Sequence, residues 1–277
     1  MSTGSLWLLM ALRVGVLAGE RVAFHGLGRG RRALPTALIA YGGAGAWLWI
    51  ACLVMHHVEW VNGAILPGVV YALSFFCYTK ALAQGPVGLV SAFANASVVM
   101  MFFIFPRWNA GSLFAMVFFI GGAWLILWGE FRASSAVLWM LCSDGALVAG
   151  RMLDLKGLPA VSLPYAATLF TVVALWLAIP ALVGGEWPRA RQLLGERPGW
   201  SFFASGCNGL SYLTVLELLR YVSPTLVEVV SAWAGVAATL AGVAVFGEAG
   251  AKRKVAAATL MTLATVMLIS SQGGKMQ

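Results

Sequence analysis

Long apolar stretches that recur along almost the whole chain limit what this sequence can fold into. Each is about 18–24 residues long, which is enough for a helix to cross the hydrocarbon core of a bilayer. Of the 277 residues, 61% are hydrophobic and only 10% are charged, whereas a water-soluble domain needs more polar residues to cover its surface. Backbone polar groups inside lipid must be satisfied within their own segment. The sequence therefore predicts a bundle of membrane-spanning helices.

The breaks between the apolar stretches divide the chain into ten predicted helices. A glycine- and arginine-rich segment covers residues 26–32, Pro86 and Pro224 each open a stretch, and Pro106 closes one, as expected of residues that interrupt helical hydrogen bonding. The longest gap runs from about residue 184 to residue 199, so no gap can hold a soluble domain. The predicted ranges are 5–25, 33–55, 63–84, 86–106, 111–130, 135–156, 159–183, 199–221, 223–247 and 252–271.

The two halves of the chain contain similar short segments. Residues 16–19 match residues 147–150 at an offset of 131, and residues 90–94 match residues 230–234 at an offset of 140. An odd number of helices in each repeat would invert the second copy in the membrane. Inverted repeats are typical of alternating-access transporters, whose substrate site lies near the middle of the membrane between the copies.

Two longer segments carry a resemblance to a known family. One is residues 71–99, which contain ALAQGPVGLVSAFANAS, and the other is LLRYVSPTLVEVVSAWAGVAATLAGVAVFGE, which ends at Glu248. They resemble the third and fourth, and the eighth and ninth, helices of the drug/metabolite transporter superfamily in its EamA-like ten-helix branch. The first half departs from the family pattern, because Pro106, Arg107 and Trp108 stand near the place of the family's first Gly-Glu pair.

This resemblance implies both a fold and a function. The fold would be one all-α membrane domain of ten transmembrane helices, in two inverted five-helix repeats, residues 1–132 and 133–277, around a central cavity. The first, third, fourth, sixth, eighth and ninth helices would line the cavity, and the fifth and tenth would pack outside it. The function would be that of a secondary transporter, which moves a small organic metabolite such as an amino-acid-like, amine or drug-like solute by alternating access. We expect it in a prokaryotic plasma (inner) membrane.

Charged residues inside two predicted helices form the first part of the candidate site. Arg13 and Glu20 stand seven residues apart, as do Asp144 and Arg151, and the offset of 131 relates the two pairs with their signs exchanged. A charge in the middle of a membrane helix costs about 2.5–3.5 kcal/mol on insertion scales, and it usually faces a cavity or a partner. Either the carboxylates bind a cation or proton and the arginines an anionic group, or Arg13 pairs with Asp144 and Glu20 with Arg151. Arg21, nearer the helix end, is expected to reach the membrane interface.

Polar and aromatic side chains on other predicted cavity helices complete the candidate site for substrate binding or gating. Such groups suit an amphipathic or zwitterionic small molecule, through hydrogen bonds, stacking and cation–π contacts. Hydrogen bonding between helices accounts for the same residue types equally well. These residues are Tyr71, Ser74, Tyr78, Asn95, Asn208, Ser211, Tyr212 and Trp233.

Other charged and aromatic residues are interpreted as helix-end features. Lys80 and Glu217 are expected to anchor helices at the interface, and Glu248 to face the basic cluster at 252–254. Tryptophans are enriched where membrane helices meet the lipid headgroups. Those interpreted as interfacial anchors or lipid-facing residues are Trp47, Trp49, Trp60, Trp108, Trp187 and Trp200.

The sequence contains no pattern that indicates catalysis or metal binding. Its histidines, His25, His56 and His57, lie near loops without metal-ligand spacing, and its cysteines, Cys52, Cys77, Cys142 and Cys207, lie singly inside predicted helices. We therefore expect no enzyme, catalytic residue, metal site, cofactor or nucleic-acid partner. The expected partners are a small-molecule substrate, membrane lipid, and a proton or another coupling ion. Both a monomer and a homodimer are compatible with the sequence, and a lipid flippase or lipid-modification helper of the same fold is the alternative function.

Two indications of membrane orientation conflict. Ten basic residues follow the first, fifth, seventh and ninth predicted helices, and four lie on the opposite side. The positive-inside rule then places both chain ends outside the cytoplasm. The resemblance implies instead that both ends are cytoplasmic, and we favour the charge count. The ten are Arg29, Arg31, Arg32, Arg132, Arg189, Arg191, Arg197, Lys252, Arg253 and Lys254, and the four are Arg107, Lys156, Arg220 and Lys275.

Overall fold

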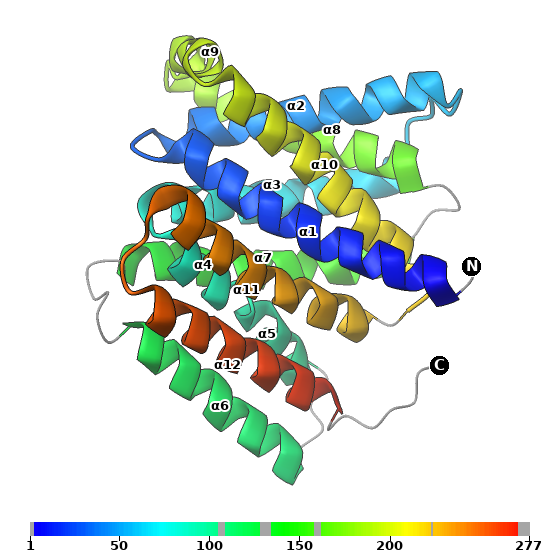
Figure 1. Ribbon diagram of the computed structural model, residues 1–277. Coiled ribbons are helices and arrows are strands. Elements are labelled where there is room, and N and C mark those ends of the chain that lie inside the picture. The colour runs from blue at the N-terminus through cyan, green and yellow to red at the C-terminus, as the bar shows by residue number, and fades with distance from the viewer. Residues whose placement is uncertain (1–2, 105–108, 128–133, 158–161, 223, 271–277) are drawn as a thin grey trace.

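The computed structural model describes residues 3–104, 109–127, 134–157, 162–222 and 224–270, and these residues form helices and turns without a β-strand (Figure 1). Helices occupy all ten of the predicted ranges. Six of them are long and apolar enough to cross a membrane, as expected of an integral membrane protein. Pro106, Arg107, Trp108, Arg132 and Lys275, and the expected boundary between residues 132 and 133, lie outside the described residues.

The helices follow one another along the chain with short connections. Their bounds are α1 Thr3–Gly28, α2 Ala33–Val54, the 3-10 helix η1 Asn62–Ala64, α3 Ile65–Gln84, α4 Val87–Phe93, α5 Ala96–Ile104, α6 Ala110–Leu127, α7 Ser134–Gly157, α8 Ser162–Val183, α9 Trp187–Glu196, α10 Pro198–Leu219, α11 Pro224–Phe246 and α12 Ala251–Ser270.

The fourth predicted helix is interrupted, which the sequence did not predict. A turn at Ala94 and Asn95 separates α4 from α5. The backbone N–H of Asn95 bonds to the carbonyl of Ala92 at 3.3 Å, and the N–H of Val98 bonds to the carbonyl of Asn95 at 3.2 Å. Bonds of this three-residue spacing tighten the chain, and asparagine favours such turns over a helix interior.

The gap predicted between residues 184 and 199 contains the short helix α9. Its residues Ala190 and Leu193 are buried, and Trp187, Arg191 and Leu194 are exposed. Apolar residues three positions apart lie on one helical face. The buried face packs on α2, so α9 is an amphipathic helix against the outside of the bundle.

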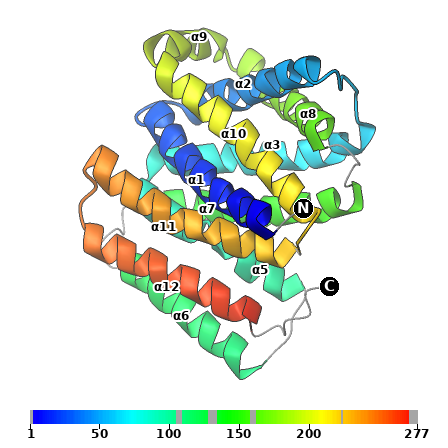
Figure 2. The same ribbon diagram turned by 45° about the vertical axis from the view of Figure 1, so that its right-hand side comes forward.

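The helices form successive layers across the bundle. The pair α2 and α8 lies at one edge, and the pair α6 and α12 lies at the opposite edge (Figures 1 and 2). Between them lie α1, α3 and α10, followed by α4, α5, α7 and α11. The first residues of α1 and the last residues of α12 lie on the same side of the bundle in both views.

Contacts between the two halves of the chain follow an exchange pattern, in which a contact between two helices has a counterpart with the halves exchanged. α1 packs on α10, and its counterpart α7 packs on α3. In the same way, α2 packs on α10, and its counterpart α8 packs on α3. α1 also packs on α11, as α7 packs on α4 and α5. The contact of α7 with α3 is close because Gly150 has no side chain, since a Cβ there would lie 2.7 Å from Cζ of Tyr71. Small residues permit such close approach of helices in membrane proteins.

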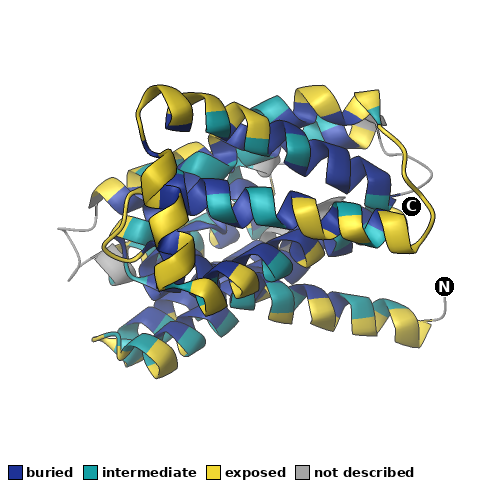
Figure 3. Cartoon of the chain, turned by 90° about the horizontal axis from the view of Figure 1, so that it is seen from above, coloured by how far each residue is buried: buried dark blue, intermediate teal, exposed yellow. Residues whose placement is uncertain are grey.

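The distribution of side chains differs from that of a water-soluble protein at the surface and at some buried positions. Buried residues line the interior of the bundle, and exposed ones cover its outer faces and loops (Figure 3). Large apolar side chains are exposed, among them Leu8 at 72% and Val183 at 86%, whereas the charged side chains of Arg13, Glu20 and Arg21 are buried. An apolar exterior, with charged side chains kept inside the bundle, is the pattern that a lipid environment favours.

Candidate functional site

A cavity of about 80 Å³, lined by apolar, polar and charged side chains, lies where α1, α3, α5, α7, α10 and α11 meet. This is enough to hold water molecules. Trp233 is 42% exposed and is the one predicted site residue outside the lining. The predicted site residues that line the cavity are Arg13, Glu20, Tyr71, Ser74, Tyr78, Asn95, Asp144, Arg151, Asn208, Ser211 and Tyr212.

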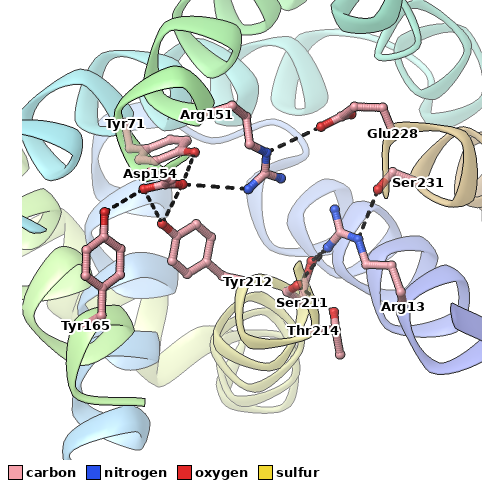
Figure 4. A network of polar contacts seen from close by, with 10 residues as sticks. All are labelled: Arg13, Tyr71, Arg151, Asp154, Tyr165, Ser211, Tyr212, Thr214, Glu228 and Ser231. Carbon is pink, nitrogen blue, oxygen red and sulfur yellow. Dashed lines mark hydrogen bonds and ion pairs between the residues drawn. The ribbon is translucent and has the colours of Figure 1, made fainter. Parts of the chain in front are cut away.

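Arg13 joins three helices through neutral acceptors. Its Nε donates to Oγ of Ser231 at 3.1 Å, and its Nη1 donates to the carbonyl and Oγ of Ser211 at 2.8 and 2.5 Å (Figure 4). Ser211 lies on α10 and Ser231 on α11. The expected pairing of Arg13 with Asp144 is therefore wrong, because serines from two other helices bind the guanidinium.

Arg151 pairs with an acid that the sequence analysis had left outside the site. Its Nε lies 3.3 Å from Oε1 of Glu228 on α11, and its Nη1 lies 3.9 Å from Oδ2 of Asp154 on α7. The expected pair of Glu20 with Arg151 is not formed. Glu228 stands near the start of α11, and only the packing of that helix brings it to Arg151.

Asp154 is held by three tyrosines and was missed by the sequence analysis. The hydroxyls of Tyr71, Tyr165 and Tyr212 donate to its carboxylate at 2.6, 2.8 and 2.9 Å (Figure 4). These tyrosines come from α3, α8 and α10, and the Asp154 side chain is completely buried. Its position three residues after Arg151 places both on one face of α7, and this spacing was a signal that could have found it.

Asp144 has no hydrogen-bond partner for either carboxylate oxygen, although its side chain is 1% exposed. The amide Nδ2 of Asn208 and the hydroxyl of Tyr78 also lack a partner. All three residues line the cavity. Buried polar groups normally have partners, so the cavity wall offers an acceptor and donors that a bound molecule could satisfy.

Arg21 lies at the cavity and not at the membrane interface, which corrects the sequence expectation. Its side chain is 4% exposed, and its Nη1 donates to the backbone carbonyl of Ser91 at 3.2 Å. Ser91 lies on α4, the short helix before the turn at Asn95. The guanidinium of Arg21 therefore has a hydrogen-bond partner inside the bundle and does not extend to the lipid headgroups.

Glu248 contacts the basic cluster as expected and also caps a helix. Its Oε2 lies 3.1 Å from Nζ of Lys254, and its carboxylate accepts bonds from the backbone N–H groups of Val87 and Gly88 at 2.6 and 3.2 Å. These N–H groups begin α4, where a negative charge is favourable. The contact therefore joins α4, α11 and α12 at one end of the cavity helices.

The remaining predicted helix-end residues lie away from the cavity. Nζ of Lys80 lies 3.7 Å from the ring centre of Trp139, and Glu217 is half-exposed beside Arg220. Trp47, Trp60 and Trp187 are exposed, whereas Nε1 of Trp49 donates to Thr171 at 2.8 Å. Trp200 is half-buried beside Gly26 and Phe246. Within the described part of the chain, no three His, Cys, Asp or Glu side chains lie together as a metal site would require.

Comparisons with known proteins bear on the fold alone. No family model matches the chain, and no curated protein is significantly similar to it. A solved structure, named only "Crystal structure of protein", has 17% sequence identity and a TM-score of 0.57, over 99% of this chain and 100% of that one. The arrangement of helices therefore occurs over the full length of another protein.

Proposed function

We propose that the chain is a secondary transporter of the drug/metabolite type, which moves a small organic metabolite across a prokaryotic plasma (inner) membrane by alternating access. The observation that carries the proposal is the small cavity with a buried, charged lining, formed by helices of both halves. Charged residues inside a membrane bundle usually serve a substrate or ion pathway. A cavity between two sets of helices can open to one side at a time.

The interrupted fourth helix supports a transport site at this cavity. Transporters often form their binding sites from broken helices, because the freed backbone groups can contact a substrate or an ion. The turn at Ala94 and Asn95 lies at the cavity, and the side chains of Asn95 and Ser97 line it.

The exchange pattern of helix contacts supports two inverted repeats. Several contacts of a first-half helix with a second-half helix have a counterpart in which the roles of the halves are reversed, as with α1 on α10 and α7 on α3. Such a pattern suits a carrier, because rocking one repeat against the other opens equivalent faces on the two sides. We propose that α1, the α4–α5 pair, α6 and α12 cross the membrane along with the six long apolar helices.

A ligand screen tests this function. The purified protein would be heated with amino acids, quaternary amines, nucleosides, sugars or short lipids, and hits would be tested for uptake into proteoliposomes. Asp144→Asn alters the cavity lining, and Glu217→Gln removes a charge outside it as the matched control. We expect a soluble solute to raise the melting temperature and enter the vesicles, with both effects lost only in Asp144→Asn.

Other results would change the assignment. Stabilisation by short lipids alone, with movement of a labelled lipid between leaflets, would favour the flippase alternative. A solute effect that is equal in wild type and Asp144→Asn would remove the cavity from the proposal.

A further inference from the structure

The buried ionisable groups that line the cavity, together with Asp154 beside Arg151, do not balance in charge. Three guanidinium groups stand against four carboxyl groups, so one negative charge is left over when all seven are ionised. Each of the seven side chains is at least nine-tenths buried. The guanidinium groups are those of Arg13, Arg21 and Arg151. The carboxyl groups are those of Glu20, Asp144, Asp154 and Glu228.

The surplus negative charge falls on Asp144. Glu228 pairs with Arg151, and Asp154 accepts three tyrosine hydroxyls. The positive charges of Arg13 and Arg21 act on Glu20. Neither oxygen of Asp144 accepts a hydrogen bond. An ionised carboxylate in such a place loses its hydration without replacement, and this costs many kcal/mol.

The helices around Asp144 do not supply the missing partner. α3 presents the neutral groups Ser74, Tyr71 and Tyr78 to the cavity, and neither α4 nor α5 contains a charged residue. α1 contributes the positive charge of Arg21, and α11 contributes the negative charge of Glu228. The guanidinium of Arg21 binds the carbonyl of Ser91. Asp144 thus faces one cation without a hydrogen bond to it and one anion that repels a second negative charge.

We propose that Asp144 binds and releases the proton that drives this carrier. Its carboxylate would take one proton from water when the cavity opens to one side, which neutralises the cluster, and would return that proton to water on the other side. This inference rests on the proposed transport function. A metal ion needs several oxygen ligands at fixed distances, and no three His, Cys, Asp or Glu side chains lie together among the described residues. A proton needs only one oxygen.

Infrared spectroscopy of the full chain in liposomes tests the proposal without any substrate. A protonated carboxyl group has a C=O stretching band that disappears on ionisation. It would be followed from about pH 6 to about pH 10, where exposed carboxyl groups, whose ordinary pKa is about 4, are already ionised. We expect wild type to show a titrating band of one carboxyl per chain. Asp144→Asn should lose it, and Asp144→Glu should keep one at a different frequency. Glu217→Gln, outside the cavity, should leave the band unchanged.

Charge balance gives a second, independent expectation. Glu228→Gln removes one negative charge, so the cluster is neutral without a proton and the band should weaken at neutral pH. Arg21→Gln removes one positive charge, so the band should persist to higher pH. If the two variants behave alike, the band does not report the charge balance of this cluster, and the proposal is wrong.

Two further results would overturn the proposal. One is the same band in wild type and Asp144→Asn. The other is loss of the band at constant pH on addition of sodium chloride or methylammonium chloride, because Asp144 would then bind that cation in place of a proton. Failure of the transport function is a separate result, since a chain that carries no solute would still show the titrating band. Solute uptake without the band would remove only the proton site.

Discussion

At the scale of single residues, the bundle keeps the charge of Asp154 inside it by means of neutral donors. Tyr71, Tyr165 and Tyr212 approach the carboxylate from three helices. A hydrogen bond to a charged group contributes about 1.5–3 kcal/mol, and removal of a donor leaves the buried charge short of a partner. Arg151 lies 3.9 Å away, so the position of this guanidinium depends on the same tyrosines.

Tyr212→Phe is expected to destabilise the protein because it removes the hydroxyl that contacts both oxygens of Asp154, at 3.0 and 2.9 Å. The expected loss is about 1–3 kcal/mol, measured as a lower melting temperature in detergent. Tyr221 is 51% exposed, and Tyr221→Phe serves as the control, with a change within about 0.5 kcal/mol. Equal melting of the two variants would contradict a stabilising role for these bonds.

Glu186, in the turn between α8 and α9, should make stability depend on pH in the acidic range. The hydrogen bond from Arg189 at 2.7 Å, together with the bond from Arg32, lowers the pKa of Glu186 below its ordinary value of 4.5. A carboxyl whose pKa is lowered by folding stabilises the protein above its unfolded pKa, and this contribution is lost as the pH falls through the folded pKa.

The measurement for Glu186 is the melting temperature of wild type and Glu186→Gln between about pH 7 and about pH 3. Wild type should be the more stable at neutral pH, and the difference should shrink below pH 4.5, the ordinary pKa of this group. A difference that stays constant over the whole range would mean that the carboxylate charge contributes nothing here.

Much of the candidate site was predictable from residue type and position, but its partners were not. Polar and charged residues inside apolar stretches predicted most of the polar members of the cavity lining, because lipid disfavours them elsewhere. The pairs were wrong, since the partner of Arg151 depends on how α11 is rotated against α7. Short-range spacing within one helix does not contain that information.

At the scale of elements, Glu248 holds the start of α4 by bonds to the N–H groups of Val87 and Gly88. Glu248→Ala should speed hydrogen exchange at these two amides and destabilise the protein by about 1–3 kcal/mol. Exchange would be followed by mass spectrometry on the purified protein. Glu196→Ala, which removes an exposed ion pair with Arg31, is the control and should leave α4 unchanged. Equal exchange rates at α4 in wild type and Glu248→Ala would contradict the cap.

The helices themselves followed from the lengths of the apolar stretches, and the exceptions have physical reasons. The turn at Asn95 was hidden because apolar residues on both sides continue the stretch, so hydropathy alone does not register it. The helix α9 was read as a connection because its charged residues dominate its composition. Its buried face consists of only Ala190 and Leu193, which is too little for a periodic pattern.

At the scale of the whole molecule, the alternation of helices makes a prediction about sidedness. The single substitutions Gly30→Cys and Gly195→Cys would be made in a background without native cysteines. Both cysteines should react with an impermeant maleimide from one side of the membrane. The cysteines of His57→Cys and Glu217→Cys should react from the other side. The charge count further predicts that Gly30 is cytoplasmic. If the cysteines at positions 30 and 57 are labelled from the same side, α2 does not cross the membrane.

The tyrosine bonds to Asp154 have a consequence for the free energy of hydrating this carboxylate. A water molecule can replace a hydroxyl donor one for one, so hydration of Asp154 exchanges bonds and does not simply break them. The net free energy of each such exchange is about 1.5–3 kcal/mol, because the acceptor is charged. Hydration of Asp154 would therefore separate α7 from α3, α8 and α10 in steps of this size, without unfolding any helix.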